Sequence, residues 1–99
     1  MNMSLPKEVK IGWKVYKVVE KEPDHDLIKD GDNCYGQIHY DRQVIIINSS
    51  MSEPQKEATL FHEVLHGISE IFDIGLEEHQ VSVLADALYI FKKDNEKAD

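Results

Sequence analysis

The sequence predicts an α+β domain in which a small antiparallel β-sheet is followed by two packed helices. Before residue 50, apolar residues alternate with polar ones or form short unbroken runs, as is typical of strands. After residue 52 they recur at intervals of three and four, which places them on one face of a helix. A chain of 99 residues can bury one core, so we expect a single domain over residues 1–99.

The first strand region follows the N-terminus. Apolar and polar residues alternate over residues 9–15, and from Tyr16 onward the alternation shifts by one position. Gly12 and Trp13 fit a tight turn or a bulge. The region is therefore either one bulged strand or a short hairpin, and in both cases we expect a strand over residues 14–19.

Two further strands are expected after a polar loop. Residues 20–32 predict the loop, because they collect a proline, several aspartates and a glycine but few apolar residues. The strands cover residues 34–40 and 44–48, joined by a connection of hairpin length. The second is continuously apolar and so predicts an inner strand covered on both faces, whereas Gly36 in the first suits an edge. Cys34 is expected to be a small core or edge residue rather than a nucleophile.

Two helices complete the chain. Ser52 is a capping residue and Pro54 lies in the first turn, so a helix is expected to begin there and to end at Gly75. Its apolar side chains at helical spacing are Phe61, Val64, Leu65, Ile68 and Phe72. A second helix is expected to begin at Leu76 or Glu77. Its predicted buried stripe consists of Val81, Leu84, Leu88 and Phe91.

The composition argues against several classes of function. The net charge of −8 supplies no basic stripe for nucleic-acid phosphates or for an anionic membrane surface. No apolar run approaches the length of a membrane-spanning helix. The N-terminus lacks the charged region and apolar run of a signal peptide, and one cysteine cannot form an intramolecular disulfide. We therefore expect a cytoplasmic protein.

The strongest indication of function is the segment His62-Glu63-Val64-Leu65-His66. Side chains four residues apart lie on the same face of a helix, so both histidines can bind one metal ion. Glu63 lies about a quarter turn away, beside the ion, where a carboxylate can take a proton from a metal-bound water. The spacing thus predicts a metal site with His62 and His66 as ligands and Glu63 as general base.

A third ligand is expected from the start of the second helix. Glu77, Glu78 and His79 follow the motif at a distance that suits a helix returning alongside the first. The apolar stripe of the second helix points back to Glu77 about as well as to Glu78, so periodicity leaves the choice open. Asp73, seven residues after His66, returns to the same helix face and could orient a ligand histidine.

These residues resemble a known group of enzymes, the small gluzincin zinc metallopeptidases of phages and prophages, which are relatives of the ImmA/IrrE-like group. The resemblance covers roughly the last two-thirds of the chain. It is carried by the Tyr35-Gly36 strand with its Ile-rich partner, by the segment from Thr59 to Ile68 that contains the motif, and by Glu77-Glu78 ahead of Val81 and Leu84-Ala85. The larger relatives have a Glu-Ala-Asn-like context around the downstream glutamate, which this chain lacks.

The resemblance implies a zincin-like fold and one Zn²⁺ held by the two motif histidines and a downstream glutamate. We choose Glu78 for this ligand, because it precedes the Val-x-x-Leu-Ala run as in the phage proteins. Ala85, seven residues later, also lets the two helices approach closely. Glu77, next to the turn, suits a first-turn acid favoured by the helix dipole. His79 is the alternative and would complete a three-histidine site.

The expected reaction is hydrolysis of peptide bonds in a peptide or protein substrate. The predicted edge strand could hold an extended peptide by strand addition. Tyr35, His39 or Tyr40 could donate a hydrogen bond to the oxyanion, although a structural role explains each of them more simply. Two alternatives are a zinc-binding phage or prophage regulatory module without protease activity, and a metal-free domain with an accidental motif.

Overall fold

The computed structural model describes residues 5–22 and 35–96. Residues 23–32 of the predicted loop, together with Cys34, lie outside the described residues, whereas Glu20 and Lys21, which were also expected in the loop, belong to a strand. The described elements are β1 (Glu8–Ile11), β2 (Lys14–Lys21), β3 (Gly36–His39), β4 (Val44–Asn48), α1 (Glu53–Ile71) and α2 (Glu78–Glu96). The prediction of an α+β fold, with strands first and two helices after them, is confirmed.

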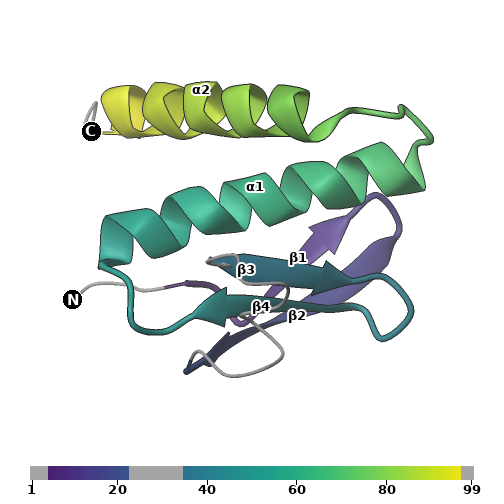
Figure 1. The fold of residues 1–99 in the computed structure, drawn as a ribbon, viewed down its shortest axis with the longest axis horizontal. Helices are drawn as coiled ribbons and strands as arrows, with labels where there is room; N and C mark the ends of the chain where they lie inside the picture. The colour runs from purple at the N-terminus through teal and green to yellow at the C-terminus, as the bar shows by residue number, and fades with distance from the viewer. Residues whose placement is uncertain (1–4, 23–34, 97–99) are drawn as a thin grey trace.

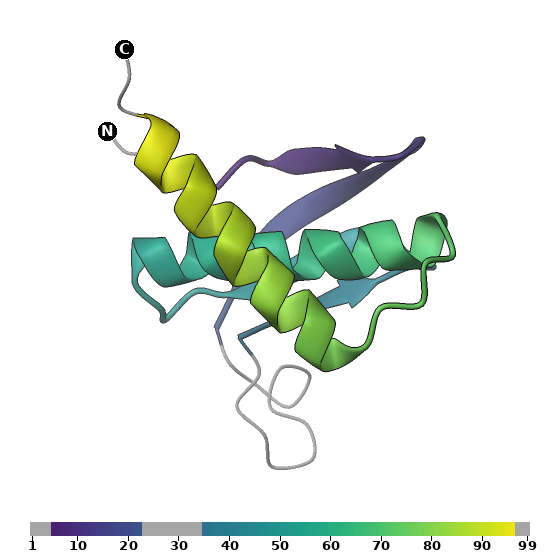
Figure 2. The ribbon, with the colours of Figure 1, turned by 90° about the horizontal axis from the view of Figure 1, so that it is seen from above.

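The elements form three layers: the sheet, α1 on one face of the sheet, and α2 on top of α1 (Figure 1). Helix α1 packs against β1, β3 and β4, whereas among the described elements α2 packs only against α1. Figure 2 shows that α2 crosses α1 obliquely. Helix α1 is therefore covered on two sides. Within the described ranges, neither helix combines the length and apolar character needed to cross a membrane.

The sheet is mixed, so the prediction of an antiparallel sheet is wrong for one pair of strands. The order is β1-β2-β4-β3, with antiparallel β1/β2 and β3/β4 pairs and a parallel β2/β4 pair. Strand β3 lies at the edge of the sheet, and β4 lies between β3 and β2. Because β3 runs opposite to both β2 and β4, these two strands run in the same direction. This arrangement places the most apolar strand inside the sheet rather than at its edge. As a result Ile45, Ile46 and Ile47 are all buried.

The first strand region is a hairpin, which decides between the two alternatives for it. Gly12, at φ 60°, lies in the turn between β1 and β2. The turn explains the shift in alternation, because Ile11 and Tyr16 both point into the core while Trp13 at the tip is exposed. The Trp13 ring packs edge-on against Phe72 at the end of α1, with ring centroids 5.7 Å apart.

Strand β3 lies at the edge of the sheet, as predicted, and its glycine allows α1 to approach closely. A Cβ atom on Gly36 would lie 2.8 Å from Thr59 Cγ2 and 2.9 Å from the Ile46 carbonyl oxygen. The same position faces Glu63, whose Oε2 atom would be 3.4 Å from that Cβ. A side chain at residue 36 would therefore push β3 away from the helix that carries the His-Glu-x-x-His motif.

We expect Gly36→Ala to lower the free energy of unfolding by about 1–3 kcal/mol. The added methyl group would collide with the Thr59 side chain and with the Ile46 backbone carbonyl, which cannot move aside easily. Chemical denaturation with an unchanged m-value would measure the loss. Thr59→Ser removes the nearer methyl group, so the double variant should recover part of the stability. Equal stability of Gly36→Ala and the parent would contradict the close packing of β3 on α1.

Helix α1 begins where the sequence predicts and ends earlier. The Ser52 Oγ accepts a hydrogen bond from the Gln55 N–H, which caps the helix at its first turn. At the other end Asp73, at φ 54°, is the left-handed residue, and the Ile74 N–H donates to the Ser69 carbonyl. Gly75 was expected to stop the helix, but Asp73 does so, because a short polar side chain tolerates the left-handed conformation.

The predicted buried stripe on α2 is largely wrong. Val81 and Ala85 are buried, whereas Leu84, Leu88 and Phe91 have exposed fractions of 42%, 44% and 66%. Because α2 has α1 as its one neighbour among the described elements, only the narrow face turned toward α1 is covered. Helix α1, which lies between two layers, buries side chains on both of its sides.

Candidate metal centre

The two motif histidines lie one turn apart on α1, on the side that faces the start of α2. Their ring centroids are 4.9 Å apart. The connection after α1 reverses the chain, and α2 begins with Glu78, whose carboxylate is in contact with both rings. The packing of Leu65 of α1 against Val81 and Ala85 of α2 holds the two helices in this register.

The three side chains converge on one point. The Nε2 atom of His62 lies 3.1 Å from Glu78 Oε2, and the Nε2 atom of His66 lies 2.9 Å from Glu78 Oε1. One ligand atom from each residue can be chosen so that all three lie within 4.8 Å of one another. A tetrahedral zinc site with bonds of about 2.0–2.2 Å places neighbouring ligand atoms about 3.4 Å apart. The two histidine-to-carboxylate distances are close to this value, so the three side chains fit a metal site.

Ser82 supports the carboxylate of this cluster and was missed by the sequence reasoning. Its Oγ donates a hydrogen bond to Glu78 Oε2 over 3.2 Å. The spacing of the sequence could have identified it, because Ser82 follows Glu78 by four residues and so lies on the same face of the helix. Hydrogen bonds of this kind hold a ligand carboxylate in place before the metal arrives.

Glu63 is buried between α1 and the sheet and lines the same cleft as the histidines. Only 6% of its surface is exposed. Burial, and next the negative charge of Glu78, raise the pKa of the Glu63 carboxyl to about 8. A pKa near neutrality suits a group that must first accept a proton and later give it up.

The electrostatic environment also favours the metal-binding form of a histidine. Burial lowers the pKa of His62, and the positive charge of His66 acts in the same direction, while Glu78 opposes them. The neutral imidazole is the form that binds a metal, so His62 stays available to lower pH than an ordinary histidine does.

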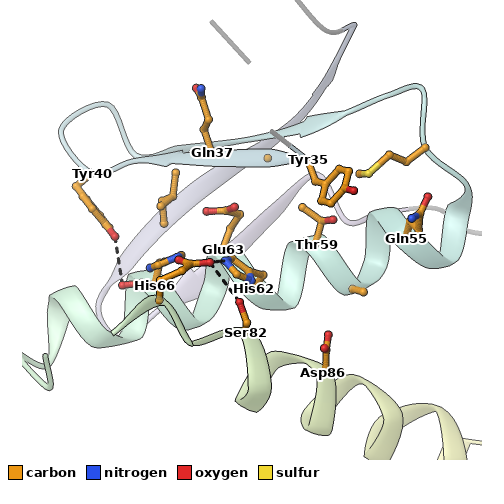
Figure 3. A pocket seen from close by; sticks show the side chains of 15 residues that line it. Tyr35, Gln37, Tyr40, Gln55, Thr59, His62, Glu63, His66, Ser82 and Asp86 are labelled. Carbon is orange, nitrogen blue, oxygen red and sulfur yellow. Dashed lines mark hydrogen bonds and ion pairs between the residues drawn. The ribbon is translucent and has the colours of Figure 1, made fainter. Parts of the chain in front are cut away.

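The cluster opens into a cleft of about 920 Å³, within the size range of ligand-binding sites. Strand β3 forms one wall of the cleft, α1 its floor and α2 the opposite wall (Figure 3). The lining residues are Tyr35, Gly36, Gln37, Ile38, Tyr40, Met51, Gln55, Ala58, Thr59, His62, Glu63, His66, Glu78, Ser82 and Asp86. The edge strand and the candidate ligands therefore share one open groove.

The three candidates for an oxyanion donor occupy different places. Tyr35 and Tyr40 line the cleft, whereas His39 does not. The Tyr40 hydroxyl donates a hydrogen bond to the His66 backbone carbonyl over 3.3 Å, which ties the end of β3 to α1. The His39 ring is hydrogen-bonded to Gln37 over 3.1 Å. Tyr40 and His39 thus have structural partners, and Tyr35 is half exposed at the rim.

The other residues considered near the site lie away from the cluster. Glu77 is exposed, and its backbone forms the first-turn hydrogen bonds of α2 with Gln80 and Val81. His79 is exposed on another side of α2, beside a shallow hollow separate from the cleft. Asp73 follows the C-cap of α1 and lines neither cavity. Of the candidate third ligands, Glu78 is the one whose side chain the structure brings to the histidines.

Comparisons with family models, with curated proteins and with solved structures find no match to this chain. We therefore infer function from the geometry of the cluster and of the cleft.

Proposed function

We propose that this protein is a zinc-dependent metallopeptidase. The observation that carries the proposal is the convergence of His62, His66 and Glu78 next to the buried carboxyl of Glu63, in a cleft bordered by an edge strand. Catalytic zinc sites commonly use three protein ligands from this set of side chains and leave a fourth position to water. Structural zinc sites close that position with protein, usually with cysteine.

The chemistry follows from the roles of these side chains. His62, His66 and Glu78 would hold the ion, which when bound would polarise the scissile carbonyl and lower the pKa of a water. Glu63 would accept the proton of this water and pass it to the leaving amine. The burial of Glu63 supports this role, because it holds the carboxyl in a fixed place and brings its pKa close to neutral.

The cleft supports a peptide as the substrate. Among the described strands, β3 pairs with β4 alone, so its other edge can offer main-chain hydrogen bonds to an extended segment. Residues of this strand line the cleft beside the ligand cluster. A peptide added to the edge of β3 would pass the cluster with its carbonyl groups at regular intervals.

The test is cleavage of a mixed peptide library by the zinc-loaded protein, with the products identified by mass spectrometry. We expect cleavage that a chelator abolishes and that added zinc restores. The His62→Ala/His66→Ala double variant, purified in the same way, controls for contaminating proteases. Stoichiometric zinc binding with no cleavage of any peptide would favour the alternative, a zinc-binding regulatory module.

A further inference from the structure

Asp86 lies in the same cleft as the candidate metal centre and has no part in the chemistry proposed above. It follows Glu78 and Ser82 at intervals of four residues, so the three side chains form a row along one face of α2. Figure 3 shows Asp86 beyond Ser82, across the cleft from Tyr35. Its side chain is exposed to solvent within the groove.

The charges along the cleft are of one sign. Among residues 5–22 and 35–96, its lining includes the carboxyl groups of Glu63, Glu78 and Asp86 and no lysine or arginine. Glu78 is in contact with the two histidines. Within residues 5–22 and 35–96, no lysine or arginine forms an ion pair with Asp86. The negative charge of Asp86 acts on His62, whose pKa it raises, but Asp86 has no cationic partner among these residues and can meet a positive charge on the substrate.

The buried Glu63 also points to a ligand in this groove. More than nine-tenths of Glu63 is buried, yet its side chain reaches the cleft. Within residues 5–22 and 35–96, no group donates a hydrogen bond to its carboxyl. A buried carboxyl without such a partner is costly to maintain and is typical of a site that meets its partner from outside the chain.

The spacing places Asp86 within reach of residues near the scissile bond. Two helical turns separate Asp86 from Glu78, which is about 12 Å along the axis of α2. An extended peptide advances by about 3.3 Å per residue, so this length corresponds to only a few residues of substrate. Lysine and arginine have long, flexible stems that carry the charge beyond the backbone.

We propose that Asp86 selects peptide substrates that carry a lysine or arginine side chain close to the scissile bond. This inference rests on the proposed peptidase function and adds a substrate class to it. Asp86 acts as a specificity-determining residue through an ion pair with the substrate. The ion pair forms at a solvent-exposed site, so the preference is modest and weakens at high salt.

The experiment uses a peptide that the zinc-loaded protein cleaves, with lysine or the uncharged methionine placed at each position near the cleaved bond. We expect kcat/KM to be about fivefold higher for the best lysine peptide than for its methionine counterpart. Asp86→Asn should bring this ratio close to one, and so should 1 M salt, where screening is strong. Asp94→Asn removes the same charge from an exposed residue of α2 outside the cleft and should leave the ratio as in the parent.

The outcomes separate this inference from the proposed function. Failure to cleave any peptide would overturn the peptidase function and this inference with it. Cleavage with no preference for lysine, or a preference that Asp86→Asn leaves intact, would overturn the role of Asp86 alone. Zinc content is measured in every variant, because a loss of zinc in Asp86→Asn would make Asp86 a support of the metal centre and would equally overturn its role in substrate selection.

Discussion

Zinc added to the purified protein is expected to bind at about one ion per chain, because two imidazole nitrogens and a carboxylate oxygen already lie together. Elemental analysis after gel filtration would measure the stoichiometry. Affinity should fall below roughly pH 6, since protonated imidazoles cannot bind a metal. A protein that holds no stoichiometric zinc after loading at neutral pH would refute the proposed metal centre.

Single variants would test which side chains hold the ion. His62→Ala, His66→Ala and Glu78→Gln should each weaken zinc binding by more than about 100-fold, because each removes a direct ligand. Glu77→Gln and His79→Ala are the matched controls, since both residues are exposed neighbours of Glu78 outside the cleft. The choice of Glu78 fails if Glu78→Gln binds zinc like the parent while either control variant loses it.

Glu63→Gln is expected to keep zinc and to lose hydrolysis. An amide fills the space of the carboxyl group but cannot accept the proton of the attacking water, so kcat should fall by about 10²- to 10⁴-fold. Kinetics on the best peptide, together with zinc content and circular dichroism of the same sample, would measure the effect.

Glu70→Gln is a suitable control for this variant. Glu70 lies on α1, is exposed and does not line the cleft, so its replacement should leave activity near that of the parent. If Glu63→Gln instead emptied the site as thoroughly as His62→Ala, Glu63 would be a ligand and its assignment as general base would be wrong.

Local interactions allowed much of the architecture to be predicted. Strand β4 has the predicted bounds, because its unbroken apolar run is flanked by polar residues on both sides. The start of α1 follows from Ser52, whose capping bond involves a residue only three positions away. The placing of His62 and His66 on one face is likewise a property of a single helix. These features depend on neighbours along the chain, so the sequence is sufficient for them.

The errors in the predicted fold concern features that depend on contacts between segments distant in the sequence. The position of β4 beside β2 depends on pairing between strands that are distant in the sequence. Because these two strands are parallel, the sheet is mixed. The exposure of Leu84 and Leu88 similarly depends on how many neighbours α2 has, which the amphipathic pattern does not reveal. An apolar stripe indicates which face a helix can bury, but the packing of other elements decides how much of it is covered.

The sequence by itself determined that a His-Glu-x-x-His helix is followed by a second helix with acidic residues at its start. Only the tertiary structure decided that Glu78, rather than Glu77 or His79, faces the histidines. Neighbouring residues on a helix point about 100° apart, so the crossing of α2 over α1 selects one of the three. The same crossing brings Asp86 into the cleft, because a helix face becomes the wall of a site only when another element lies opposite it.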